Sequence, residues 1–66
     1  MATSYQYIEC VGTSTESVEK AIQTAIDTVG KNNKISWFEI LATRGRLVDG
    51  NAIEYQVTVK CGVIAA

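Results

Sequence analysis

The segment from Ala52 to Val63 alternates between apolar and polar side chains from Ile53 to Cys61, and no other feature of the chain restricts its fold as strongly. The residues of one parity are Ile53, Tyr55, Val57, Val59, Cys61 and Val63, and those of the other are Glu54, Gln56, Thr58 and Lys60. Because successive side chains on a β-strand point to opposite faces, this pattern predicts a strand with one covered face and one open face. The fold must therefore supply an element that covers one side of a sheet.

A helix is expected to supply that cover. Residues 5–11 predict a first strand, and Gly12-Thr13-Ser14 is expected to break it, with Ser14 or Thr13 as the N-cap of a helix. The helix is expected to continue to about Val29 and to end at a left-handed Gly30. Its apolar side chains recur at helical spacing and form one stripe, made of Val18, Ala21, Ile22, Ala25, Ile26 and Val29.

The rest of the chain predicts a hairpin. A second strand is expected from about Lys34 to Leu47, and either Asp49-Gly50 or Gly50-Asn51 supplies the tight turn into the strand at 52–63. A right-handed crossover through the helix leaves a place between strands one and two, which strand three fills. We therefore expect one α+β domain over residues 1–66, ordered β-α-β-β. Its three-stranded antiparallel sheet has spatial order 1-3-2, with the helix packed on one face.

Trp37 is the side chain that this arrangement leaves most conspicuously exposed. In the run around it, Phe38 and Ile40 share one parity and are expected to cover the core, so Trp37 points to the open face together with Glu39. The other residues expected on that face are Leu41, Gln56, Thr58 and Lys60. A large aromatic side chain on an uncovered sheet face indicates a partner, either another subunit or a planar ligand.

Composition excludes several classes of function. The chain has no histidine and a net charge of −1, so neither histidine catalysis nor electrostatic binding of nucleic acid or acidic membranes is expected. It shows no transmembrane segment and no signal peptide, and we expect a cytoplasmic protein whose Cys10 and Cys61 are free thiols. No nucleophile–base pair is apparent, so we do not expect an enzyme. A chain this short buries only about 60% of its unfolded surface, which favours oligomerisation.

Four segments in register resemble the dodecin family over nearly the whole chain. They are Ile8-Glu9-Cys10-Val11-Gly12-Thr13-Ser14, Trp37-Phe38-Glu39-Ile40, Arg44-Gly45, and Tyr55-Gln56-Val57-Thr58-Val59-Lys60 followed by Gly62. The resemblance implies a dodecameric hollow shell that stores or sequesters flavin without catalysis, with flavin pairs stacked at subunit junctions. It implies that Trp37 stacks on the flavin and that Gln56 and Arg44 contact it.

Several alternatives remain open at the level of sequence. The resemblance does not say whether riboflavin, FMN or coenzyme A is preferred, whether Arg44 or Arg46 contacts the ligand, or whether metal ions bind. Arg44 has the parity of Phe38, so a bulge or twist must redirect it if it is to serve the same face as Trp37. The alternative function is a ligand-free homo-oligomer in which Trp37 only seals an interface.

Overall fold

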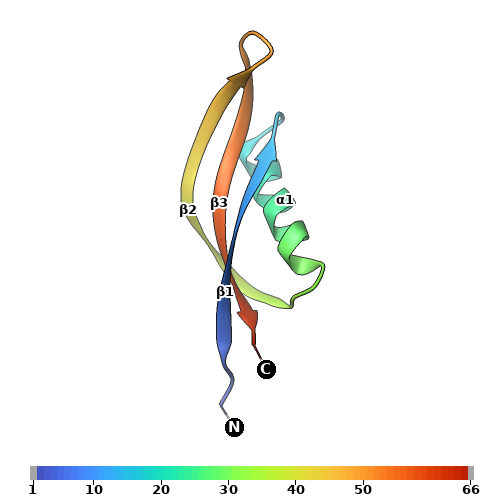
Figure 1. Ribbon diagram of the computed structural model, residues 1–66, viewed down its shortest axis with the longest axis vertical. Coiled ribbons are helices and arrows are strands. Elements are labelled where there is room, and N and C mark those ends of the chain that lie inside the picture. The colour runs from blue at the N-terminus through green and yellow to red at the C-terminus, as the bar shows by residue number, and fades with distance from the viewer. Residues whose placement is uncertain (1, 66) are drawn as a thin grey trace.

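The computed structural model describes residues 2–65 and contains one helix and three strands in this part of the chain. They are β1 (Tyr5–Ser14), α1 (Val18–Gly30), β2 (Ile35–Val48) and β3 (Ala52–Ile64). β3 is the central strand and pairs antiparallel with both neighbours, so the sheet order is β1-β3-β2 (Figure 1). The predicted α+β arrangement and strand order are confirmed.

The core lies between α1 and the face of the sheet formed by β1 and β3 (Figure 1). Its buried members are Ala21, Ala25 and Val29 from the helix and Val57, Val59, Cys61 and Val63 from β3. The alternation of β3 therefore has the predicted meaning, except that Ile53 lies beyond the reach of the helix and is exposed. Cys10 and Cys61 are both free, as expected.

Gly12 does not break β1, contrary to the prediction. The strand continues to Ser14, and Gly12 pairs with Val57. A Cβ atom at Gly12 would overlap the carbonyl oxygen of Ala21 and lie 2.8 Å from the backbone nitrogen of Ala25. The glycine is needed because the helix backbone packs directly on the strand at this point.

Both predicted helix caps were wrong. The N-cap is Ser17, whose hydroxyl accepts a hydrogen bond of 3.0 Å from the backbone N–H of Lys20, because the strand extends further than expected and delays the helix. Gly30 is the last helical residue and does not adopt a positive φ; Lys31 follows it with right-handed geometry. The hairpin turn is centred on Asp49 and Gly50, whose φ angles of 43° and 88° suit a type I′ turn.

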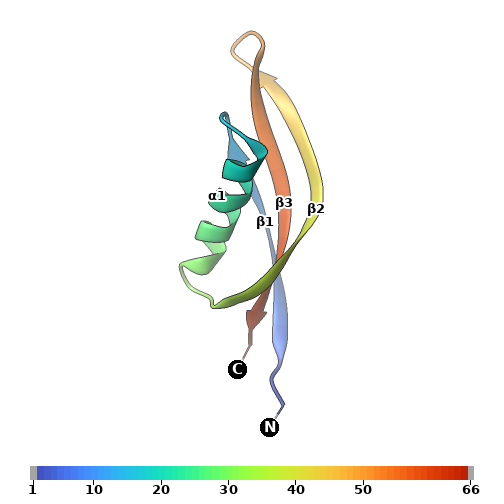
Figure 2. The same cartoon turned by 180° about the vertical axis from the view of Figure 1, so that it is seen from behind.

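β2 is exposed on both faces, which corrects the prediction for Phe38 and Ile40. These residues pair with Cys61 and Val59 and so share their face, yet they are 46% and 43% exposed. The helix packs on β1 and β3 and scarcely touches β2. In Figure 2, β2 curves away from α1 along the far edge of the sheet.

A β-bulge between Ile40 and Ala42 reverses the facing of the second half of β2. Glu39 pairs with Lys60, whereas Ala42 pairs with Thr58 and Arg44 with Gln56, so Leu41 is an extra residue without a partner in β3. Leu41 therefore does not take the regular place on the open face that was predicted for it. The bulge moves Arg44 onto the same face as Trp37, which simple alternation did not allow.

Candidate functional site

Trp37 lies across the central strand on the open face of the sheet. It pairs with Gly62 of β3, and a Cβ atom added at Gly62 would overlap the indole, with Cδ2 of the ring only 2.6 Å away. Three adjacent ring atoms are nearly equidistant from that position, so one face of the ring rests on the glycine. The residue remains 37% exposed, and its outward face is available for a planar partner.

Two tyrosines of β1 border the indole. The ring of Tyr5 lies 4.9 Å from it at an interplanar angle of 65°, and that of Tyr7 lies 5.8 Å away at 86°. Both are edge contacts, which suit the opposite charges of a ring's face and edge. The indole therefore reaches from β2 over Gly62 to β1, and all three strands contribute to its position.

Glu39 connects the polar atoms of this aromatic group. Its Oε2 atom accepts a hydrogen bond of 2.8 Å from the hydroxyl of Tyr7 and a longer one of 3.4 Å from Nε1 of Trp37. The bond from Tyr7, then that from Trp37 and the charge of Lys60 lower the pKa of Glu39. The same bond to Glu39 raises the pKa of Tyr7. The ammonium of Lys60 lies 4.2 Å from the centre of the Tyr7 ring.

A second group of side chains, which is polar, lies nearer the hairpin on the same face. The Nε atom of Arg44 donates to Oε1 of Gln56 at 2.7 Å, and the amide of Gln56 donates to Glu54 at 3.1 Å. Arg46 forms an ion pair of 2.7 Å with the same oxygen of Glu54. The bond from Gln56 and then that from Arg46 lower the pKa of Glu54.

The structure unites two of the three candidate residues and separates the third. Arg44 and Gln56 touch, whereas Trp37 lies opposite Gly62, six residues further along β3 than Gln56. At roughly 3.3 Å per residue this is about 20 Å. The aromatic group and the polar group of one chain are therefore two separate surfaces.

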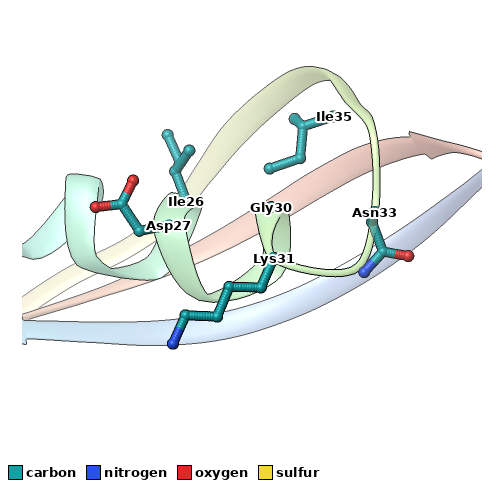
Figure 3. A pocket seen from close by; sticks show the side chains of 6 residues that line it. All are labelled: Ile26, Asp27, Gly30, Lys31, Asn33 and Ile35. Carbon is teal, nitrogen blue, oxygen red and sulfur yellow. The ribbon is translucent and has the colours of Figure 1, made fainter.

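Two depressions within one chain lie elsewhere. One is on the helix beside Ser17 and Gln23. A wider one, about 540 Å³, lies between the end of α1 and the start of β2 and includes Ile26, Asp27 and Ile35 (Figure 3). Neither includes a candidate residue. Within residues 2–65 no three metal-ligating side chains gather, and the helix of this range is too short and polar to span a membrane.

Sequence reasoning missed several residues around the indole. Gly62 was noted only as part of a motif, although an isolated glycine inside a strand opposite Trp37 signals a close approach. Tyr5 and Tyr7 were missed because both faces of β1 are apolar in the sequence, which hides the open one. Cross-strand register, which brings Glu39 to Tyr7, leaves no signal in a single sequence.

Comparison with known proteins agrees with this architecture. The Dodecin family model matches residues 4–64. The dodecin of Thermus thermophilus is 38% identical over 63 residues, which are 94% of this chain and 91% of that protein. The crystal structure of the tt0972 protein from the same organism has a TM-score of 0.89 at 35% identity and covers 98% of this chain and 97% of that chain. Dodecin from Streptomyces davaonensis has a TM-score of 0.90 at 34% identity, with coverage of 100% and 98%. This chain belongs to the dodecin family.

Proposed function

We propose that this protein binds, stores and sequesters flavin without catalysis, in a dodecameric hollow shell, with flavin pairs stacked on Trp37 at subunit junctions. The observation that supports this most directly is the indole of Trp37, which rests on Gly62 and exposes its other face to solvent. A flat isoalloxazine ring fits such a surface, since stacked aromatic rings attract each other through dispersion and offset π contact.

The separation of the two surfaces supports a site at a subunit junction. Within one chain the polar group lies about 20 Å from the indole along β3. A flavin on Trp37 would therefore meet Gln56 and Arg44 of another copy. Exposure of both faces of β2 supports assembly independently, because its apolar side chains are left uncovered in the single chain.

The polar group has chemistry that suits the rest of the ligand. An amide offers donors and an acceptor to the mixed edge of a flavin pyrimidine ring. Guanidinium groups of Arg44 and Arg46 suit a ribityl or phosphate group, which would favour FMN. Because Gln56 already bonds Arg44 and Glu54, ligand binding would exchange these contacts for new ones.

The ligand-free oligomer remains the second candidate, and the exposed surface of β2 favours it. Phe38 and Ile40 on one face and Trp37 on the other would be covered by subunit contacts whether or not a ligand is present. In that case Trp37 would be buried by protein and would leave no space for a flavin.

One set of measurements separates the two functions. The purified protein should show flavin absorbance. Mass spectrometry of the extracted ligand should then distinguish riboflavin from FMN and show whether coenzyme A is bound as well. Light scattering should give a dodecameric mass. Trp37→Ala should weaken riboflavin and FMN binding more than tenfold in calorimetry, because removing one aromatic stack costs about 1–3 kcal/mol and the substitution would remove two symmetry-related indoles from each flavin pair. Thr24→Ala, on the exposed side of α1 and away from both surfaces, is the control. An intact Trp37→Ala oligomer with wild-type affinity would refute the stacking mechanism.

A further inference from the structure

We propose that Glu39 and Tyr7 are positioning residues, which hold the Trp37 indole flat on Gly62 before any ligand arrives. The ligand-binding consequence rests on the function proposed above, whereas the positioning itself does not. Oε2 of Glu39 accepts hydrogen bonds from both the hydroxyl of Tyr7 and the indole of Trp37. A single carboxylate oxygen thus ties a side chain of β1 to one of β2 across the central strand.

The two hydrogen bonds contribute differently. The bond of 2.8 Å from the Tyr7 hydroxyl is strong and charge-assisted, whereas the contact of 3.4 Å from the indole is weak. The main action on the ring is therefore indirect. Glu39 fixes Tyr7, and the Tyr7 ring, whose centre lies 5.8 Å from that of the indole at an interplanar angle of 86°, limits how far the indole can tilt.

The glycine beneath the indole makes this restraint necessary. Gly62 permits close contact between the ring and the strand, but it has no side chain to restrain lateral movement of the ring. Tyr5 and Tyr7 border the indole on one side, and the Trp37 side chain has two rotatable bonds of its own. If Glu39 and Tyr7 fix these bonds before the ligand arrives, binding loses less side-chain conformational entropy and is tighter.

Charged groups around Glu39 supply an internal control. Glu9, Lys60 and Glu39 are paired in one row across the three strands, so Lys60 lies between two carboxylates. Tyr7 also faces Glu39 from β1. Glu9 contacts neither Tyr7 nor the indole through a hydrogen bond, which makes Glu9→Gln a charge-matched control for Glu39→Gln.

The first measurement needs no ligand. Trp37 is the only tryptophan of the chain, so time-resolved fluorescence anisotropy of flavin-free protein reports the mobility of this ring alone. Fast depolarisation should increase in Glu39→Ala, which removes the acceptor of the Tyr7–Glu39 bond. It should also increase in Tyr7→Phe, which removes only the donor hydroxyl. Glu39→Gln keeps an acceptor oxygen and should lie between Glu39→Ala and the wild type, and Glu9→Gln should match the wild type.

The second measurement is riboflavin affinity of the same oligomers. Loss of one restrained side chain should raise the Kd by between about twofold and tenfold in Glu39→Ala and Tyr7→Phe. Unchanged anisotropy in both variants would overturn the proposal, and a mobile indole with unchanged affinity would overturn its ligand-binding consequence. If the wild type binds no riboflavin, the flavin function fails while the anisotropy still decides whether Glu39 holds the ring. If Glu39→Ala does not assemble, Tyr7→Phe carries both measurements.

Discussion

β2 and β3 are neighbouring strands of 14 and 13 residues, yet one is exposed on both faces and the other is buried on one. Ile40 and Val59 are direct partners on the same face, and they are 43% and 0% exposed. A helix is about 10–12 Å wide and strands are about 4.8 Å apart, so one helix covers only two strands. Burial in this chain therefore depends on a residue's distance from the helix more than on its hydrophobicity.

Two strand glycines repeat the same contrast. Gly12 lies under backbone atoms of α1, which cannot move aside, whereas Gly62 lies under the indole of Trp37, a side chain that can. On the covered face glycine permits the core to form. On the open face it provides the flat surface on which the candidate ligand-binding ring rests.

Gly12→Ala should have the largest effect. The new Cβ atom would overlap the carbonyl oxygen of Ala21, so the helix must move and the core must open. We expect a loss of up to about 3 kcal/mol in the free energy of unfolding, measured by urea denaturation. A wild-type midpoint would show that the helix does not pack as closely as the structure indicates.

Val59→Ala and Ile40→Ala compare the two strands at one position of the ladder. Val59 is fully buried, and its truncation should cost about 2 kcal/mol of unfolding free energy. Ile40 is partly exposed in the single chain, so its truncation should chiefly weaken assembly, seen as dissociation at higher protein concentration in sizing experiments. If Val59→Ala and Ile40→Ala changed the unfolding free energy and the assembly equally, the difference in burial between β3 and β2 would have no energetic consequence.

Gly62→Ala should have a smaller effect on folding than Gly12→Ala. The new Cβ atom would displace the indole, which destabilises the folded state, whereas alanine reduces the conformational freedom of the unfolded chain, which favours folding. Because these contributions oppose each other, the net change in unfolding free energy should stay within about 1 kcal/mol. Flavin affinity should fall nevertheless, because the indole of Trp37 can no longer lie flat on the strand at this position. Riboflavin titration alongside urea denaturation measures both, and unchanged affinity would mean that the position of the ring on Gly62 has no role.

The dependence of stability on pH should be the smallest effect, because the groups concerned are exposed. The lowered pKa of Glu39 means that its bond to Tyr7 contributes stability above the ordinary value of 4.5 and loses it as the pH falls. The raised pKa of Tyr7 means that the contribution is present below 10.0 and is lost as the pH rises.

Urea midpoints across pH test this window. Glu39→Gln should reduce the acid dependence and Tyr7→Phe the alkaline dependence, while Glu9→Gln should retain the alkaline one. An unaltered alkaline dependence in Tyr7→Phe would show that the Tyr7–Glu39 bond does not form in solution.

Much of the architecture could be read from local patterns. Alternation in 52–63, the helical stripe and the Asp49-Gly50 turn predicted the elements and the 1-3-2 order, because side-chain period and turn chemistry depend on near neighbours in the chain. The open face of β3 followed from the same alternation, and the outward position of Trp37 followed from the parity of its neighbours Phe38 and Ile40.

Other features depend on contacts between distant residues. Local pattern placed Arg44 on the wrong face, because the bulge at Leu41 is defined only by pairing with β3. Local pattern also predicted that Gly12 ends the strand. The structure shows instead that a glycine is needed there because backbone atoms of Ala21 and Ala25 approach it closely.

By itself, the sequence determined the order and approximate extent of the strands and the helix and which face of β3 is apolar, since these depend on periodicity along the chain. Only the tertiary structure decided that α1 leaves β2 uncovered and that the bulge turns Arg44 to the open face. It also decided that Trp37 reaches Tyr7 over Gly62, while Gln56 lies too far along β3 to join it. The physical reason is that register, bulges and helix placement depend on pairing between strands distant in sequence, and one shifted residue changes every facing beyond it.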